Sequence, residues 1–187
     1  MIKVIFSIML LISPVFSNGK MSGVSYFDYT YDLTEDAPND DGFSLSRTYL
    51  TYKNDISDEL SYKFQTDVGN LTLIDIKDDR WKIENRFVVY LKKAQLDWKS
   101  PIGKITLGMQ GMNMFNVKEK TWGFRFLEKS PMDLHKFSSS ADMGVGYSGK
   151  MGDMSYSALM TNGSGYKSQE DDKFKKYHFK LFMVRKS

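Results

Sequence analysis

Apolar and polar residues alternate with a period of two along most of the chain, as in β-strands that have one apolar face. In residues 60–68 the apolar Leu60, Tyr62, Phe64 and Val68 alternate with serine, lysine, glutamine and aspartate. The same alternation, interrupted by segments rich in Gly, Asn, Asp and Ser, predicts eight strands in an all-β chain. The predicted strands cover residues 20–33, 43–53, 60–68, 86–99, 105–112, 141–148, 154–161 and 174–184.

The fourth and fifth predicted strands form a hairpin over residues 94–112, which turns at the sequence Ser100-Pro101-Ile102-Gly103. Serine, proline and glycine stand there at the positions that a type I turn prefers. The apolar face of the hairpin carries Leu96, Trp98, Ile105 and Leu107, and the polar face carries Gln95, Asp97, Thr106 and Gln110. In a soluble sandwich the apolar face turns toward a core, whereas in an outer-membrane barrel it turns outward to lipid.

The lengths of the connections favour the barrel. Long segments at 35–42, 69–85, 113–137 and 162–172 alternate with short ones at 54–59, 100–103 and 149–153. Outer-membrane barrels have short turns at one rim and longer loops at the other. We therefore predict an antiparallel up-and-down transmembrane β-barrel, with Trp98 at the membrane interface. Residues 87–91 are apolar on both faces, and the alternation does not explain them.

The first 19 residues indicate export. Lys3 is followed by an apolar run and by small residues, so residues 1–19 are predicted to be a signal peptide that is cleaved after Ser17 or Gly19. Residues 20–187 then form the outer-membrane β-barrel. The chain has no cysteine and a net charge of +3, so thiol chemistry is excluded and a general attraction to nucleic acid is not expected.

Residues 113–137 contain the helix signals. Residues 117–128 place Trp122 and Phe126 on one helical face, and Ser130 followed by Pro131 and Asp133 resembles a helix N-terminus. The segment either folds into the lumen as a constriction loop or lies over the rim. The candidate constriction residues are Trp122, Arg125, Lys129 and His135.

Charged and amide side chains are predicted on the face that would line a lumen. They either set ion selectivity or neutralise one another across strands. The candidate pore-lining residues are Arg47, Lys63, Gln65, Asp67, Lys93, Gln95, Asp97, Lys176 and Lys180. Basic residues outnumber acidic ones in this set, which favours anions. The two histidines, His135 and His178, lie in different elements, and no metal-binding or catalytic spacing is present.

Three segments resemble the bacterial porins of the phosphate-selective O and P type. They are SRTYLTYK at 46–53, LSYKFQTD at 60–67 and KAQLDW at 93–98. The resemblance implies a water-filled barrel of about sixteen strands, commonly trimeric, that passes small anions or nutrients. The sequence departs from that family because it has about eight predicted strands and ends on Arg185-Lys186-Ser187. We expect an N-terminal half of a porin, since a complete eight-stranded barrel has no lumen for a long third loop.

The leading functional hypothesis is an outer-membrane porin for passive diffusion of small hydrophilic solutes, with a weak preference for anions. The alternative is a small, closed, non-conducting eight-stranded barrel that acts as an anchor or adhesin. A secreted ligand-binding β-sandwich and a barrel-embedded hydrolase are further alternatives. The expected partners are outer-membrane lipid, small anionic or polar solutes and two further copies in a homotrimer. Nucleic acid and cofactors are not expected.

Overall fold

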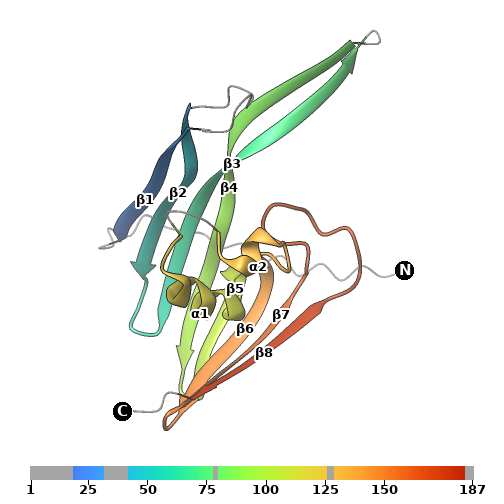
Figure 1. Ribbon diagram of the computed structural model, residues 1–187. Helices are drawn as coiled ribbons and strands as arrows, with labels where there is room; N and C mark the ends of the chain where they lie inside the picture. Colours follow the sequence, from blue (N-terminus) through green and yellow to red (C-terminus); the bar gives the residue numbers. More distant parts are fainter. Residues whose placement is uncertain (1–18, 32–41, 78–79, 126–128, 184–187) are drawn as a thin grey trace.

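The computed structural model describes residues 19–31, 42–77, 80–125 and 129–183. Figure 1 shows one long curved sheet, with two short helices in front of its middle strands. The strands are β1 (Lys20–Thr30), β2 (Gly42–Asp55), β3 (Leu60–Lys77), β4 (Arg80–Ser100), β5 (Gly103–Gly111), β6 (Ala141–Met151), β7 (Met154–Thr161) and β8 (Lys176–Met183). The helices, α1 (Asn113–Trp122) and α2 (Pro131–Leu134), lie between β5 and β6 in the chain.

The sheet has the simplest antiparallel order. Each of the eight strands pairs with the next, from β1 to β8. The prediction of an all-β, up-and-down chain is confirmed. β1 and β8 lie at the two edges, and no ladder joins them in the described part of the chain, so the sheet is open. Closure into a barrel of about sixteen strands stays a prediction.

The turn between β4 and β5 lies at residues 100–103, where the sequence predicts it. β4 pairs with β5 so that Ser100 faces Gly103, and the Ser100 hydroxyl donates to the Gly103 carbonyl oxygen at 2.7 Å. The hairpin register places Leu96 opposite Leu107, as the alternation predicts. The signal peptide through residue 18, the end of the predicted first strand and residue 184 lie outside the described residues.

The predicted long loop at 69–85 is wrong. β3 and β4 instead stay paired from Leu60 opposite Trp98 to Lys77 opposite Arg80. Their far end projects beyond the other strands in Figure 1. The predicted loop began at Gly69, where a side chain would come within 3.0 Å of the Tyr90 ring. The glycine makes room for a neighbouring ring inside a strand and does not end it.

A β-bulge in β4 determines which of the apolar residues 87–91 point to each face of the sheet. The pairing with β3 shifts between Gln65 and Thr66 and leaves Lys92 without an opposite residue. One extra residue inverts the alternation beyond it. Lys92 and Lys93 therefore both point to the face that carries the helices, and residues 87, 89 and 91 point to the other face.

The two faces of the sheet differ in character. We call the face against α1 and α2 the inner face and the opposite one the outer face. Exposed apolar side chains of the outer face include Phe27, Phe43, Phe87, Val89, Leu107, Phe179 and Leu181. Buried polar side chains of the inner side include Arg47, Asp67, Lys92, Gln95, Thr106, Gln110, Asn113 and Asp142. The buried apolar cluster is small: Met112, Phe115 and Leu159, with Met132 packed against it.

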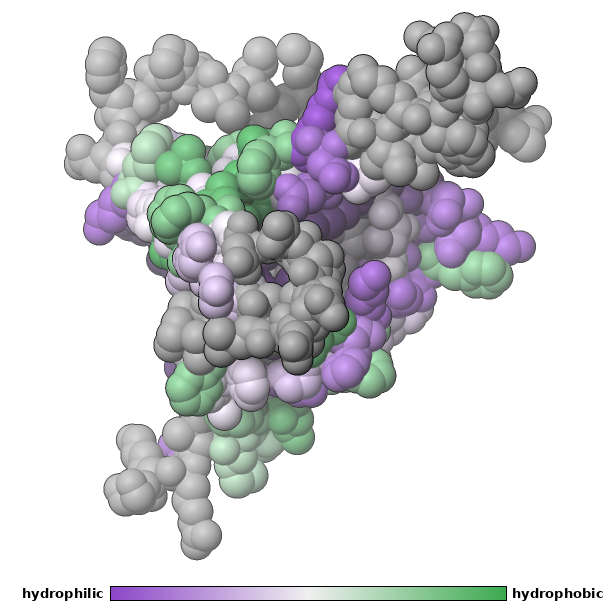
Figure 2. Space-filling model, turned by 45° about the horizontal axis from the view of Figure 1, so that its top comes forward, coloured by the Kyte–Doolittle hydropathy of each residue, from purple (hydrophilic) through white to green (hydrophobic). Residues whose placement is uncertain are grey.

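Apolar and hydrophilic residues also gather in different parts of the molecular surface. In Figure 2 apolar residues gather in patches on the left flank and at the lower edge, while hydrophilic residues gather on the right. Among the described residues, no helix is long and apolar enough to cross a membrane.

Candidate functional site

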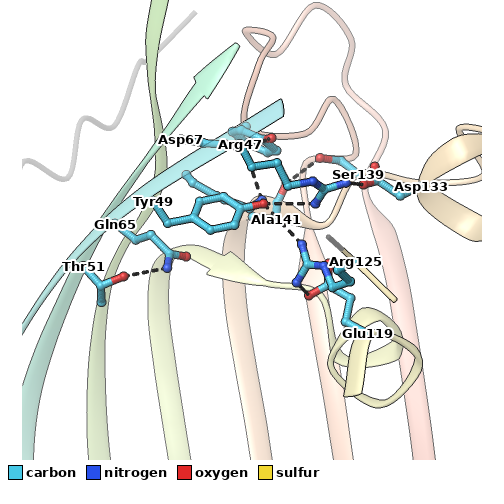
Figure 3. A network of polar contacts seen from close by, with 12 residues as sticks. Arg47, Tyr49, Thr51, Gln65, Asp67, Glu119, Arg125, Asp133, Ser139 and Ala141 are labelled. Carbon is cyan, nitrogen blue, oxygen red and sulfur yellow. Dashed lines mark hydrogen bonds and ion pairs between the residues drawn. The ribbon is translucent and has the colours of Figure 1, made fainter. Parts of the chain in front are cut away.

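A cluster of charged residues around the phenol of Tyr49 lies on the inner face (Figure 3). Three cations reach the Tyr49 oxygen: Arg47 Nη1 and Lys92 Nζ donate at 3.1 Å, and Arg125 Nη2 donates at 3.2 Å. Lys92 Nζ also lies 4.4 Å from the centre of the Tyr49 ring, a cation–π contact. β2, β4 and the segment after α1 thus meet at one hydroxyl.

Each of these cations also has its own carboxylate. Arg47 pairs with Asp133 of α2 at 3.2 Å, and Lys92 pairs with Asp67 of β3 at 3.2 Å. Arg125 pairs with Glu119 of α1 at 2.7 Å. We call the seven residues Arg47, Tyr49, Asp67, Lys92, Glu119, Arg125 and Asp133 the Tyr49 cluster. The three cations and three carboxylates balance, so none of these charges is left unpaired, which would be costly where it is buried.

The connection between β7 and β8 reaches the same cluster. The Tyr166 hydroxyl donates to Asp67 Oδ2 at 2.7 Å, and burial, followed by this contact, raises the pKa of Tyr166. Asp142 at the start of β6 accepts hydrogen bonds from the backbone N–H groups of Gly163, at 2.6 Å, and Gly165, at 3.2 Å. The Tyr49 cluster therefore ties two separate connections to the wall formed by β2, β3 and β4.

A second polar region lies on the inner face, toward the short turns. It is a cavity of about 270 Å³, which we call the lysine cavity. Its lining residues are Lys63, Lys93, Gln95, Lys104, Thr106, Gln110, Gly111, Asn113, Gly146, Tyr147, Ser148, Ser157, Leu159 and Lys180. They come from β3 to β8 and from the start of α1, so the curvature of the sheet brings them together.

The charges of the lysine cavity are not balanced. Lys104 pairs with Asp97 at 3.4 Å, and Asp97 also accepts hydrogen bonds from Thr106 and Gln95. In the part of the chain that the structure describes, no carboxylate forms an ion pair with Lys63, Lys93 or Lys180. Ammonium groups that face a cavity without carboxylates attract anions.

The N-terminus of α1 borders the same cavity. No side chain caps this helix, and its preceding residue is the buried, apolar Met112. Asn113 is 5% exposed, and its Nδ2 donates to Ser157 Oγ at 3.1 Å. Lys180 Nζ donates to the Asn113 carbonyl oxygen at 3.4 Å. The Asn113 side-chain oxygen Oδ1 is buried and has no hydrogen-bond partner.

The predicted pore-lining residues divide between these two regions. Arg47 and Asp67 belong to the Tyr49 cluster, whereas Lys63, Lys93, Gln95 and Lys180 line the lysine cavity and Asp97 adjoins it. Gln65 donates to Thr51 at 2.7 Å, on the wall. Lys176 is exposed at the start of β8 and donates to the Gly163 carbonyl oxygen at 3.0 Å.

The segment between β5 and β6 lies against the inner face, although its helix differs from the prediction. α1 begins four residues earlier than the expected residue 117. Ser130 is at the N-cap of α2 as expected, but its hydroxyl is buried and makes no capping hydrogen bond. Arg125, one of the four predicted constriction residues, contacts the wall through the Tyr49 hydroxyl.

The Trp122 ring meets Phe124 edge-on, His135 is exposed beside Phe137, and Lys129 is exposed. The contacts of Tyr49, Lys92, Glu119, Asp133 and Tyr166 were not predicted. The sequence contains one indication of the bulge, the adjacent lysines at 92 and 93. Strict alternation would place only one of them on the polar face.

The chemistry that these groups support is ionic attraction and hydrogen bonding. Among the described residues, no group of three or more His, Cys, Asp and Glu side chains is placed to hold a metal ion. No family model, curated protein or solved structure matches this chain.

Proposed function

We propose that this chain forms the wall of an outer-membrane pore that lets small hydrophilic solutes, preferentially anions, diffuse passively. The observation that carries the proposal is the distribution of polarity between the two faces of the sheet. The outer face exposes large apolar side chains, such as Phe179, which is 77% exposed, while the inner face holds the charges. A soluble protein hides its apolar faces, whereas a membrane barrel presents them to lipid.

The same distribution argues against a soluble sandwich. The large exposed apolar side chains of the strands lie mainly on the outer face, which no second layer of described residues covers, and the inner face has a small apolar cluster around Phe115. Exposed apolar surface of this extent marks an interaction site in a soluble protein. A continuous band across successive antiparallel strands fits a lipid surround better than a single partner.

The contents of the inner face support a pore wider than eight strands. An eight-stranded barrel has room inside for side chains only. Here α1, α2 and the lysine cavity all lie against the inner face. The unpaired edges of β1 and β8 would not be tolerated in lipid, so we propose that further strands close the barrel.

Anion preference follows from the lysine cavity. Lys63, Lys93 and Lys180 supply positive charge without ion-paired carboxylates, and the Tyr49 cluster is balanced. Charged side chains that line a pore select ions of the opposite sign. Solutes would pass by diffusion, and their size would be limited by the segment between β5 and β6.

Planar-bilayer recordings of the closed barrel, in which this chain is joined by the further strands proposed above, test this function. We expect conductance steps and a reversal potential that indicates anion preference under a salt gradient. The double variant Lys63→Glu plus Lys93→Glu should lose or invert that preference. The matched control is Lys118→Glu plus Lys173→Glu, which makes the same charge change at exposed positions outside the cavity.

Two results would refute the proposal. A chain that stays soluble and monomeric without detergent would not be an outer-membrane protein. A folded chain that inserts into bilayers without any conductance would instead support the anchor or adhesin.

A further inference from the structure

We propose that a second copy of this chain closes the barrel, with β8 of each copy paired to β1 of the other. The inference rests on the proposed function, which needs further strands, and it names their source. β1 and β8 are the edges of the sheet, and no described strand pairs with the outer side of either. Each copy contributes eight strands, so two copies give sixteen, the number at which a barrel encloses an aqueous channel.

The directions of the edge strands fit this joint. Each strand of the sheet is antiparallel to the next, so β8 runs opposite to β1. When two copies have the same orientation in the membrane, β8 of one copy is therefore antiparallel to β1 of the other. The same contact forms twice around a twofold axis, and no unpaired strand edge is left in lipid.

Closure of one copy on itself does not fit the inner face. An eight-stranded barrel has room inside for side chains only. Here α1 and α2 both lie on the inner side of the sheet (Figure 1). The edges of a single copy therefore have to be covered by strands from elsewhere, and a second copy brings an edge of each kind.

The faces of the edge strands limit how they pair. Phe27 of β1 and Phe179 of β8 are exposed on the outer face. Asp28 and Lys176 are an odd number of residues away from these rings and so point to the inner face. A shift by one residue would turn every side chain of one strand to the wrong face, so the possible registers differ in steps of two.

Opposite charges select one of these registers. Asp28 and Lys176 both lie at the rim opposite the turn at 100–103. The hydroxyl groups of Ser44 and Ser46 donate to Asp28 and leave its negative charge without a counter-ion. Among the described residues, no cation forms an ion pair with Asp28 and no carboxylate forms one with Lys176. Pairing the two across the joint neutralises both charges.

This register uses the whole of the shorter strand. With Asp28 opposite Lys176, every residue of β8 has a partner in β1, down to Met183 opposite Met21. On the outer face Tyr177 then lies opposite Phe27, and both side chains are exposed in the single copy. Aromatic pairs directly opposite each other stabilise antiparallel strands.

Disulfide cross-linking of the full chain in detergent tests the joint. The chain has no cysteine, so two introduced cysteines report a single contact. Phe27→Cys and Tyr177→Cys, carried on separate copies that are expressed together, should form a disulfide-linked product of two chains. The matched control replaces Tyr177→Cys by Leu107→Cys, an exposed outer-face position in β5 in the middle of the sheet, and should give no such product.

A charge exchange tests the register. Asp28→Lys in both cysteine variants should remove most of the cross-linked product, because it places two cations opposite each other. Adding Lys176→Asp should restore the product, which also shows that the variants fold. Loss of the product that the second change does not restore would overturn the pairing of Asp28 with Lys176.

Light scattering of the original chain in detergent should give twice the mass of one chain. A folded monomer, a disulfide within one chain that carries both cysteines, or a ring of three or more copies would overturn the inference. A chain that folds only as part of a longer polypeptide would overturn it as well, since the further strands would then belong to that polypeptide.

Conductance distinguishes this failure from failure of the proposed function. A longer polypeptide that closes the barrel and conducts would refute the second copy alone. A cross-linked barrel of two chains that inserts into bilayers without conductance would refute the pore and leave the joint between β1 and β8 standing.

Discussion

The Tyr49 cluster and the lysine cavity occupy the same inner face and are built from the same kinds of residue, yet their charges are arranged differently. In the cluster three cations have three carboxylates and share one phenol. In the cavity Lys63, Lys93 and Lys180 have no ion-paired carboxylate among the described residues. The difference supports two separate roles within the proposed function, in which the cluster holds the segments in place and the cavity attracts anions.

The largest expected effect is on the free energy of unfolding, at Asp67. Asp67→Asn removes the carboxylate that pairs with Lys92, whose side chain is 9% exposed, and that accepts from Tyr166. Leaving a buried cation unpaired should cost about 3 kcal/mol. Urea unfolding in detergent micelles measures this loss. The control Asp153→Asn, in an exposed turn, should change stability by less than about 0.5 kcal/mol. Equal effects of the two variants would show that the cluster is not structural.

The lysine cavity should respond in the opposite way. Lys63→Met plus Lys93→Met removes two like charges that have no ion-paired carboxylate, so we expect no loss of stability in the same urea experiment, and a small gain if the two ammonium groups repel each other. The double variant should at the same time lose the anion preference in bilayers. A loss of stability as large as that of Asp67→Asn would mean that these lysines are structural and would remove the contrast between the two regions.

The sequence was sufficient to predict the features that depend on local alternation. The order of the strands, the short turns and the register of the hairpin at 94–112 all follow from side chains that repeat every two residues. The predicted loop at 69–85 was wrong, and Gly69, at its start, lies inside β3. The reason for a glycine there is a contact with Tyr90 across the ladder, which only the three-dimensional register reveals.

The candidate site was predicted less completely. Single-strand reasoning found Lys63, Lys93 and Gln95, since each lies on the polar face of its own strand. It did not find the Tyr49 cluster, because Tyr49 meets Lys92 and Arg125 through contacts between segments far apart in the chain. It also could not find the contact of Asn113 with Ser157, which depends on how α1 packs against β7. A period of two gives the direction of a side chain and does not identify its partner.

Salt should separate the two regions by the smallest but most diagnostic effect. Between 0.1 M and 1 M salt the Debye length falls from about 10 Å to about 3 Å, and this screens charges that are open to water more than buried pairs. The anion preference due to the lysine cavity should therefore decline toward equal permeability of anions and cations as salt rises. The stability difference between the original chain and Asp67→Asn should change little over the same range, because the Lys92–Asp67 pair is buried. Reversal potentials and urea midpoints measured at matched salt concentrations check both expectations. If both quantities fall together with salt, the cluster is as accessible to ions as the cavity, and its charges would then contribute to selectivity as well.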